Sequence, residues 1–134
     1  MLSTILPAES YRKYLSKQVR KGPLARYLQQ PLPGRNRPVT ATEFLALDFE
    51  TTGLDARREA VLCAGFTVVR DGRVVLRENG HYVIQINRLL PKESVVIHKI
   101  TDHRMRQGIH LHELMEILLE KLAGRVLLVH YAQV

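Results

Sequence analysis

The sequence has 134 residues, the length of a single domain, and 46% of them are hydrophobic, an ordinary share for a globular protein. No apolar run reaches the roughly 18 residues of a membrane-spanning helix, and the N-terminus lacks the apolar core of a secretory signal. Cys63 is the single cysteine and lies in an apolar run, so we expect a small core residue and no disulfide. These features predict a protein without a membrane partner in a reducing, cytoplasmic setting.

The positive charge is concentrated near the N-terminus. The formal net charge is +7, and residues 1–40 carry eight basic side chains against Glu9, whereas residues 41–134 carry twelve side chains of each sign. Such asymmetry is typical of a basic arm that binds polyanions, and it is equally typical of a solvated helix face. The eight basic residues are Arg12, Lys13, Lys17, Arg20, Lys21, Arg26, Arg35 and Arg37.

Two helices are predicted in this N-terminal segment. The first covers residues 7–20 and ends before Gly22-Pro23, and the second, shorter helix covers residues 24–28. We expect the tyrosines on these helices to dock on the domain body rather than to stack on bases. The prolines of residues 31–38 predict a linker. A basic helical extension at residues 1–40 would therefore precede a domain at residues 41–134.

An antiparallel meander of three strands is predicted next. A two-residue hairpin turn is indicated by Asp71-Gly72. Asn79-Gly80 suggests a bulge or a second turn. The strands themselves are β-branched and apolar, and they are expected at residues 44–48, 60–70 and 74–86.

A helix and a parallel strand are predicted after an irregular segment. Lys121 lies late in the helical pattern and Gly124 follows it, as the helix dipole and a glycine C-cap require. Residues 126–129 are expected to form a short buried strand, and a helix leading into it favours parallel pairing with the first strand. The apolar stripe of this helix consists of Leu111, Leu114, Met115, Leu118 and Leu122.

Two carboxylates follow the apolar part of the first strand. Asp48 and Glu50 are two residues apart, so in an extended chain their side chains point to the same face. A cation would relieve their repulsion, and Mg²⁺ and Mn²⁺ prefer such oxygen ligands. On spacing alone, two hydrated acids at a strand end are the preferred interpretation.

The longer segment Asp-Phe-Glu-Thr-Thr-Gly, at residues 48–53, changes that interpretation. It resembles the first motif of the DEDD (DnaQ-like) 3'–5' exonucleases, the superfamily of the epsilon proofreading subunit of DNA polymerase III and of RNase T. In that superfamily the two acids at the positions of Asp48 and Glu50 bind the metal ions. The resemblance also implies a substrate-binding role for Thr51.

A second similarity surrounds Glu93 and His98. The superfamily has a Glu, followed five residues later by His-Gly-Ile-Thr, and this chain has the same spacing with Lys99 in place of the glycine. The resemblance implies that Glu93 and His98 bind the 3'-terminal nucleotide. If the family glycine adopts a positive φ, Lys99 would be strained at that position.

A third similarity begins at His130, where the superfamily has His-Asn-Ala and then an acid. Tyr131 replaces the asparagine, and the acid would follow Val134. The His-x-x-x-x-Asp motif with the general base would follow later, so we expect no catalytic base within the chain. The resemblance runs from Phe44 to Val134 and implies a ribonuclease H-like mixed α/β sheet, truncated at its C-terminus.

The resemblance implies a 3'–5' exonuclease that hydrolyses single-stranded DNA or RNA from 3' ends with two Mg²⁺ or Mn²⁺ ions. A role in DNA repair or proofreading follows from it, with a DNA polymerase as a candidate partner. The truncated chain is expected to be inactive alone. The alternative is a non-catalytic protein that binds nucleic acid or a partner through its basic arm.

Overall fold

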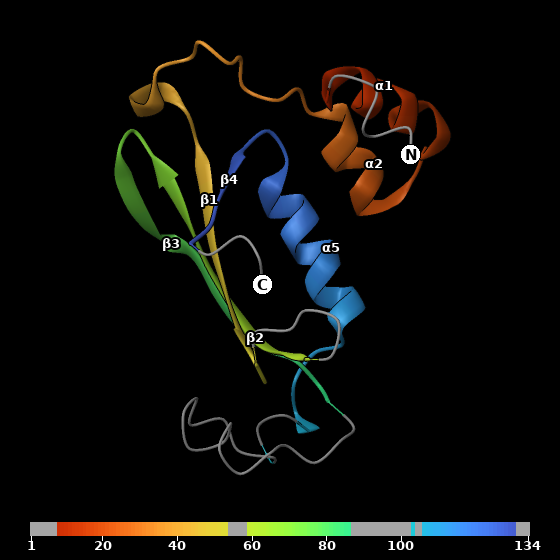
Figure 1. The fold of residues 1–134 in the computed structure, drawn as a ribbon, viewed down its shortest axis with the longest axis vertical. Helices are drawn as coiled ribbons and strands as arrows, with labels where there is room; N and C mark the ends of the chain where they lie inside the picture. The colour runs from red at the N-terminus through yellow and green to blue at the C-terminus, as the bar shows by residue number, and fades with distance from the viewer. Residues whose placement is uncertain (1–7, 54–58, 87–102, 104–105, 131–134) are drawn as a thin grey trace.

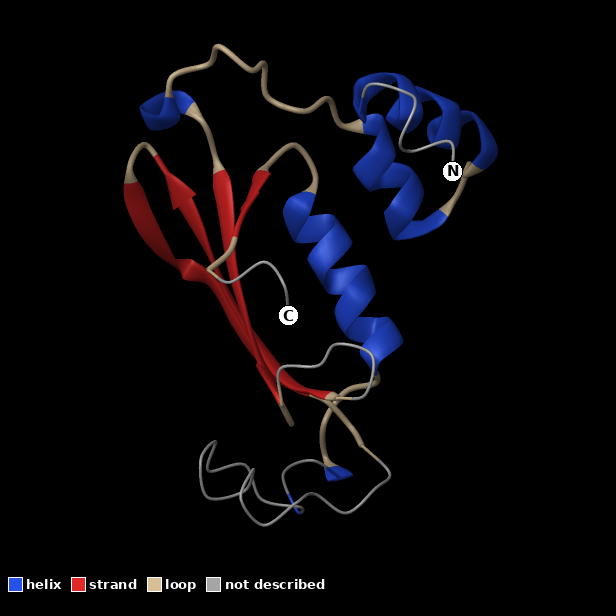
Figure 2. Ribbon diagram, in the orientation of Figure 1, coloured by secondary structure: helices blue, strands red, loops and turns tan. Residues whose placement is uncertain are grey.

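The computed structural model describes residues 8–53, 59–86, 103 and 106–130. Within these ranges a four-stranded sheet carries one long helix on one face, and two further helices lie beside that helix (Figure 1; Figure 2). None of the described helices is long and apolar enough to cross a membrane. The elements are α1 (Ala8–Gln18), α2 (Gly22–Gln29), the 3-10 helix η2 (Val39–Ala41), β1 (Phe44–Thr51), β2 (Val61–Arg70), β3 (Arg73–Val83), α5 (Leu111–Leu122) and β4 (Val126–Leu128).

The sheet has the strand order β3-β2-β1-β4. β1 pairs with β2 and β2 with β3 in antiparallel fashion, whereas β4 pairs with β1 in parallel, with Phe44 opposite Val126. α5 supplies the crossover that a parallel pair requires. The predicted meander, the parallel strand and the mixed α/β architecture of the ribonuclease H-like fold are therefore confirmed.

The predicted turn and bulge in the β2–β3 hairpin are both present. Asp71 and Gly72 have φ values of 52° and 67°, so both central residues are left-handed, as a type I′ hairpin turn requires. The pairing register then shifts opposite Thr67, because Phe66 pairs with Gly80 and Val68 pairs with Val75. The extra residues of β3 form the bulge that Asn79-Gly80 predicted.

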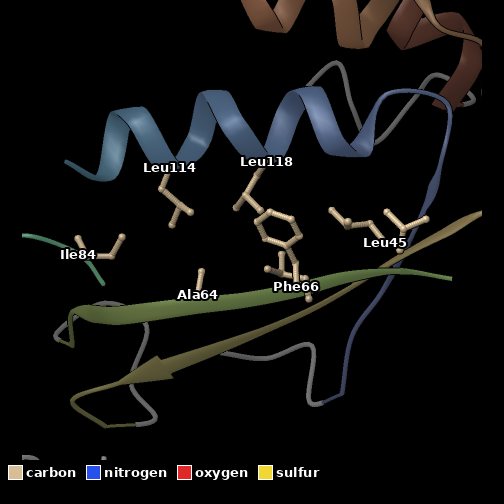
Figure 3. Packing of buried hydrophobic residues seen from close by; sticks show 8 residues of the cluster. Leu45, Ala64, Phe66, Ile84, Leu114 and Leu118 are labelled. Atoms are coloured by element: carbon tan, nitrogen blue, oxygen red, sulfur yellow. The ribbon is translucent and has the colours of Figure 1, made fainter. Parts of the chain in front are cut away.

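The hydrophobic core lies between α5 and one face of the sheet (Figure 3). Leu114 and Leu118 point from α5 toward the sheet, and the ring of Phe66 rises from β2 next to Leu118, on the side toward Leu45. The ring of Phe66 stacks on Tyr82, with 5.9 Å between the ring centroids. The buried residues of this cluster are Leu45, Leu47, Ala64, Phe66, Val68, Ile84, Leu114 and Leu118.

Two details of the predicted burial are wrong. Leu111 and Met115 belong to the predicted apolar stripe of α5, but 51% and 46% of their surfaces are exposed. Ile117, the residue before Leu118, packs against the core instead. The strand at 126–128 was expected to be buried, yet all its residues are exposed, because β4 is an edge strand and no described helix covers its side chains.

An ion-pair network ties the end of α5 to the sheet. Glu43, just before β1, accepts hydrogen bonds from Arg70 Nε at 2.7 Å and from Arg125 Nε at 2.9 Å. Arg70 also bonds Glu78 at 2.9 Å, and Arg125 donates to the carbonyl of Lys121 at 2.7 Å. The hydrogen bonds from Arg70 are the main cause that lowers the pKa of both Glu43 and Glu78.

Helix α1 packs on α2, and α2 packs on α5. Arg12 is buried, although arginine is rarely so. Its guanidinium donates to the carbonyls of Tyr27 and Gln30 at the C-terminal end of α2, and it lies 4.7 Å from the centroid of the Tyr27 ring. The carbonyls at a helix C-terminus attract a cation, so Arg12 joins α1 firmly to α2.

Candidate metal and substrate site

Asp48 and Glu50 lie on the face of the sheet that α5 does not cover. Along β1 the side chains alternate: Leu45 and Leu47 are buried in the core, whereas Asp48 and Glu50 are exposed. Because strand side chains alternate with a period of two, the two carboxylates project from the same face. The sequence predicted this placement, which depends only on the strand assignment.

The backbone just after the two acids is held by local hydrogen bonds. The Thr51 hydroxyl donates to the carbonyl of Gly53 at 2.6 Å. The N–H of Thr52 donates to the carbonyl of Ala60 at 3.0 Å, and the N–H of Ala60 donates to the Thr52 hydroxyl at 3.0 Å. Glu59 accepts a hydrogen bond from the same hydroxyl. These bonds close the loop between β1 and β2 and fix the end of the strand that carries the acids.

A groove of about 840 Å³ crosses this open face, and Asp48 is one of the residues that line it. Asp48 pairs with Gly65, and Gly65 pairs with His81, so the three residues form one row across β1, β2 and β3. Glycine in the middle of the row leaves space between the carboxylate and the imidazole. The lining residues are Ala46, Leu47, Asp48, Gly65, Phe66, Thr67, Asn79, Gly80, His81, Leu128, Val129 and His130.

The sequence interpretation named Asp48 and His130 but did not bring them together with Thr67 and His81 in one groove. His81 lies in β3 and His130 lies two residues after β4, far along the chain, and only pairing across the sheet brings them to one groove. Thr67 adds a buried hydroxyl that bonds to no group among the described residues. The alternation of β3 could have placed His81 on the open face, but the bulge between Val75 and Gly80 makes counting along that strand unreliable.

The chemistry of Asp48 and Glu50 fits a divalent cation. Both are oxygen donors at an exposed edge, and Mg²⁺ is commonly held by one or two carboxylates that leave the remaining positions to water and phosphate. Over the described ranges, no group of three or more histidine, cysteine or acidic side chains is placed to hold a metal. His112 lies near Glu116, 3.6 Å away on the surface of α5, far along the chain from the two acids.

Other predicted site residues fall outside the described ranges. Glu93 and His98 lie there, as does the segment 131–134 with Tyr131 and Val134. Their substrate-binding roles remain predictions. Cys63 is described and buried, as predicted for a core residue.

Residues 45–134 match the model of an exonuclease family, the one named for RNase T. The match covers more than half of the chain and includes both Asp48 and Glu50. It begins at the second residue of β1, so α1 and α2 lie outside it.

The similar curated proteins are named as DNA polymerase III proteins. The chain is 29% identical over 89 residues to the PolC-type DNA polymerase III of Thermotoga petrophila, which covers 66% of this chain and 6% of that protein. It is 32% identical over 94 residues to the DNA polymerase III subunit epsilon of Buchnera aphidicola subsp. Baizongia pistaciae, covering 66% of the chain and 38% of the subunit. The chain thus matches well under half the length of these relatives.

Solved structures of exonuclease I share the fold. Exonuclease I of Methylocaldum szegediense superposes with a TM-score of 0.59 at 18% identity, over 67% of this chain and 20% of that one. Exonuclease I of E. coli in complex with a dA16 oligonucleotide gives a TM-score of 0.56 at 15% identity, over 66% and 19% of the two chains. At these identities the likeness concerns the fold alone.

Proposed function

This chain belongs to the exonuclease family, and from that premise we propose that it carries the first two metal-binding acids of a 3'–5' exonuclease acting on single-stranded nucleic acid. The observation that carries the proposal is the pair Asp48 and Glu50, exposed on one face at the end of β1 beside an open groove. Two divalent ions, when bound, supply an activated water and charge neutralisation at the scissile phosphate.

The chain's own residues would hold the metal ions and position the substrate. Asp48 and Glu50 would hold the ions from the rigid backbone of β1, whose far end is fixed by the hydrogen bonds around Thr52. The groove over Gly65, with a volume of about 840 Å³, would receive the substrate next to Asp48. Glu93 and His98, by resemblance, would bind the terminal nucleotide.

Single-stranded DNA is the substrate we propose first. The curated relatives are named as DNA polymerase III proteins, and an exonuclease I structure holds a dA16 oligonucleotide. A role in proofreading or repair, with a DNA polymerase as partner, belongs to the same proposal.

Calorimetric titration of the 134-residue chain with Mn²⁺ tests the metal site. We expect weak binding, because the sequence holds two of the four family acids, and we expect Asp48→Asn and Glu50→Gln each to abolish it. Glu113→Gln, which removes an exposed acid from α5, is the matched control and should bind as the parent does. Equal Mn²⁺ binding by all four proteins would overturn the site assignment.

Release of mononucleotides from a 3'-labelled single strand tests the reaction. The 134 residues contain no His-x-x-x-x-Asp, and a general base contributes roughly 10²–10⁴-fold to such rates. We therefore expect hydrolysis by this polypeptide alone to be slow or undetectable. Rapid turnover that Asp48→Asn abolishes would place the base within these residues. Oligonucleotide binding with no metal binding would favour the non-catalytic alternative.

A further inference from the structure

The N-terminal helices carry an exposed surface that the exonuclease match leaves unexplained. Arg12 is buried against α2, and Arg26 forms an ion pair with Glu120 of α5. Arg37 donates to the carbonyl of Ala41. These three cations of the extension therefore already serve the fold.

The remaining cations of α1 and the turn after it are exposed. Lys13 and Lys17 are four residues apart on the helix, and Arg20 and Lys21 lie in the turn that follows Val19. The hydrogen bond from the N–H of Val19 to Leu15 continues the helical path by one residue. A spacing of four places Lys13 and Lys17 on one helix face. Arg20 and Lys21 are exposed in the turn between α1 and α2, where the backbone of Lys21 is extended.

Tyr14 belongs to the same face. It lies three residues before Lys17, and 45% of its surface is exposed, contrary to the predicted docking on the domain body. Its ring stacks on that of Tyr11, with centroids 6.5 Å apart and planes inclined by 21°. We call Lys13, Tyr14, Lys17, Arg20 and Lys21 the basic stripe.

We propose that the basic stripe is a second binding surface for single-stranded nucleic acid, separate from the groove at Asp48. Four exposed cations within nine residues, on the end of α1 and the turn after it, suit the repeated charge of a phosphate backbone. An exposed aromatic ring among them can stack on a base. The bases of a single strand are free to stack in this way, whereas those of a duplex are not. The proposal rests on the proposed function only in the choice of nucleic acid as the polyanion.

The position of the stripe is fixed relative to the sheet. Ala25 and Leu28 of α2 are buried, and α2 packs on α5 near Glu120, which is close to the end of that helix. α5 leads into β4, which pairs with the first residues of β1, from Phe44 to Ala46. The extension therefore lies at the end of the sheet where β1 begins, whereas the acids lie toward its other end (Figure 1). Strand bound at the stripe would not occupy the metal site.

Binding to a fluorescent oligothymidylate in EDTA, measured over a range of salt, tests the surface without any metal. The triple variant Lys13→Gln, Lys17→Gln and Arg20→Gln should bind more weakly. The slope of log K against log salt should become shallower by about 2, because each lost contact to a single strand removes about 0.7. The control removes the same charge from exposed sites outside the extension, with Arg73→Gln, Arg77→Gln and Arg106→Gln, and should keep most of the slope.

Tyr14→Ala sharpens the choice of ligand. It should reduce affinity for the single strand roughly fivefold or more, as loss of one stacked base does, and leave the salt slope and duplex binding unchanged. A stripe triple variant with the parent's slope, or a control triple with the larger loss, would overturn the proposal. So would binding to phosphatidylserine vesicles without binding to the oligonucleotide. Because EDTA removes metal, failure here is distinct from failure of Asp48 and Glu50 to bind Mn²⁺.

Discussion

The two faces of the sheet are built from the same strands, yet they serve different purposes. On the face under α5, side chains such as Leu45, Phe66 and Leu114 interlock in a closed apolar layer. On the open face, Asp48, Gly65 and His81 form a row with space above it. Alternation along each strand therefore separates the residues that stabilise the fold from those available for binding, and substitutions on the two faces should have different consequences.

The largest loss of stability is expected from the covered face. Leu114 is fully buried, so Leu114→Ala should lower the free energy of unfolding by about 2–5 kcal/mol through lost burial and a cavity. Met115→Ala, next to it on the exposed side of α5, should cost far less. Urea denaturation measures both, and similar losses would mean that α5 does not pack as described.

Alanine substitution of two glycines, one on each face of the sheet, tests the difference in packing between the faces. A Cβ on Gly80 would lie 2.4 Å from Cζ of Phe66, inside the packed layer, whereas a Cβ on Gly65 would meet only His81, at 4.0 Å. Gly80→Ala should therefore destabilise by about 1–3 kcal/mol through overpacking. Gly65→Ala should be neutral or slightly stabilising, since alanine loses less chain entropy on folding. Thermal unfolding measures the stability of both variants. A larger loss in Gly65→Ala than in Gly80→Ala would contradict this assignment of the two faces.

Acid should weaken the attachment of α5 to the sheet. The pKa values of Glu43 and Glu78 are lowered in the folded state, mainly by hydrogen bonds from Arg70. A carboxyl group whose pKa is lowered by folding stabilises the folded state at pH values above its pKa in the unfolded chain. That contribution is lost as the pH falls below about 4.3, the ordinary pKa of glutamate.

Arg70→Gln removes the main cause of both shifts. It should lower stability at pH 7 and flatten the decline between pH 5 and lower values, as followed by urea denaturation at several pH values. Arg73→Gln, an exposed arginine of the same hairpin, serves as the control. A decline as steep in Arg70→Gln as in the parent would assign the acid sensitivity to other groups.

The smallest effect on stability is expected at the proposed metal site. Asp48→Asn removes an exposed charge on the open face, so without metal the free energy of unfolding should change by no more than about 0.5 kcal/mol. With Mn²⁺ present, only the parent should be stabilised, because a ligand that binds the folded state raises its stability. Thermal shifts with and without Mn²⁺ measure the difference, and a large loss in the absence of metal would make Asp48 structural.

Local pattern predicted most of the described fold. The dipeptide Asp71-Gly72 specified its turn because few residues tolerate two left-handed positions in succession. Gly124 specified the end of α5 because glycine readily adopts the left-handed conformation that follows many helices, here with φ at 74°. The pair Asp48 and Glu50 was found on one face because that placement requires only an extended chain. Each of these predictions depends on neighbours along the sequence.

Burial of particular residues depended on partners that are distant in sequence. Met115 and Leu111 satisfy the helical period, but the orientation of α5 against the sheet turned Ile117 inward instead. β4 is as apolar as a buried strand, yet its place at the edge of the sheet leaves it exposed.

The sequence alone determined the motif acids, the strand that holds them and the concentration of charge in the first 40 residues, since these follow from local spacing and composition. Tertiary structure decided that His81 and His130 share a groove with Asp48, and that Arg12 is a buried structural cation while Lys13 is exposed. Such distinctions depend on which surfaces pack together. Packing is set by the register and by helix contacts between residues far apart in the chain, which no local pattern encodes.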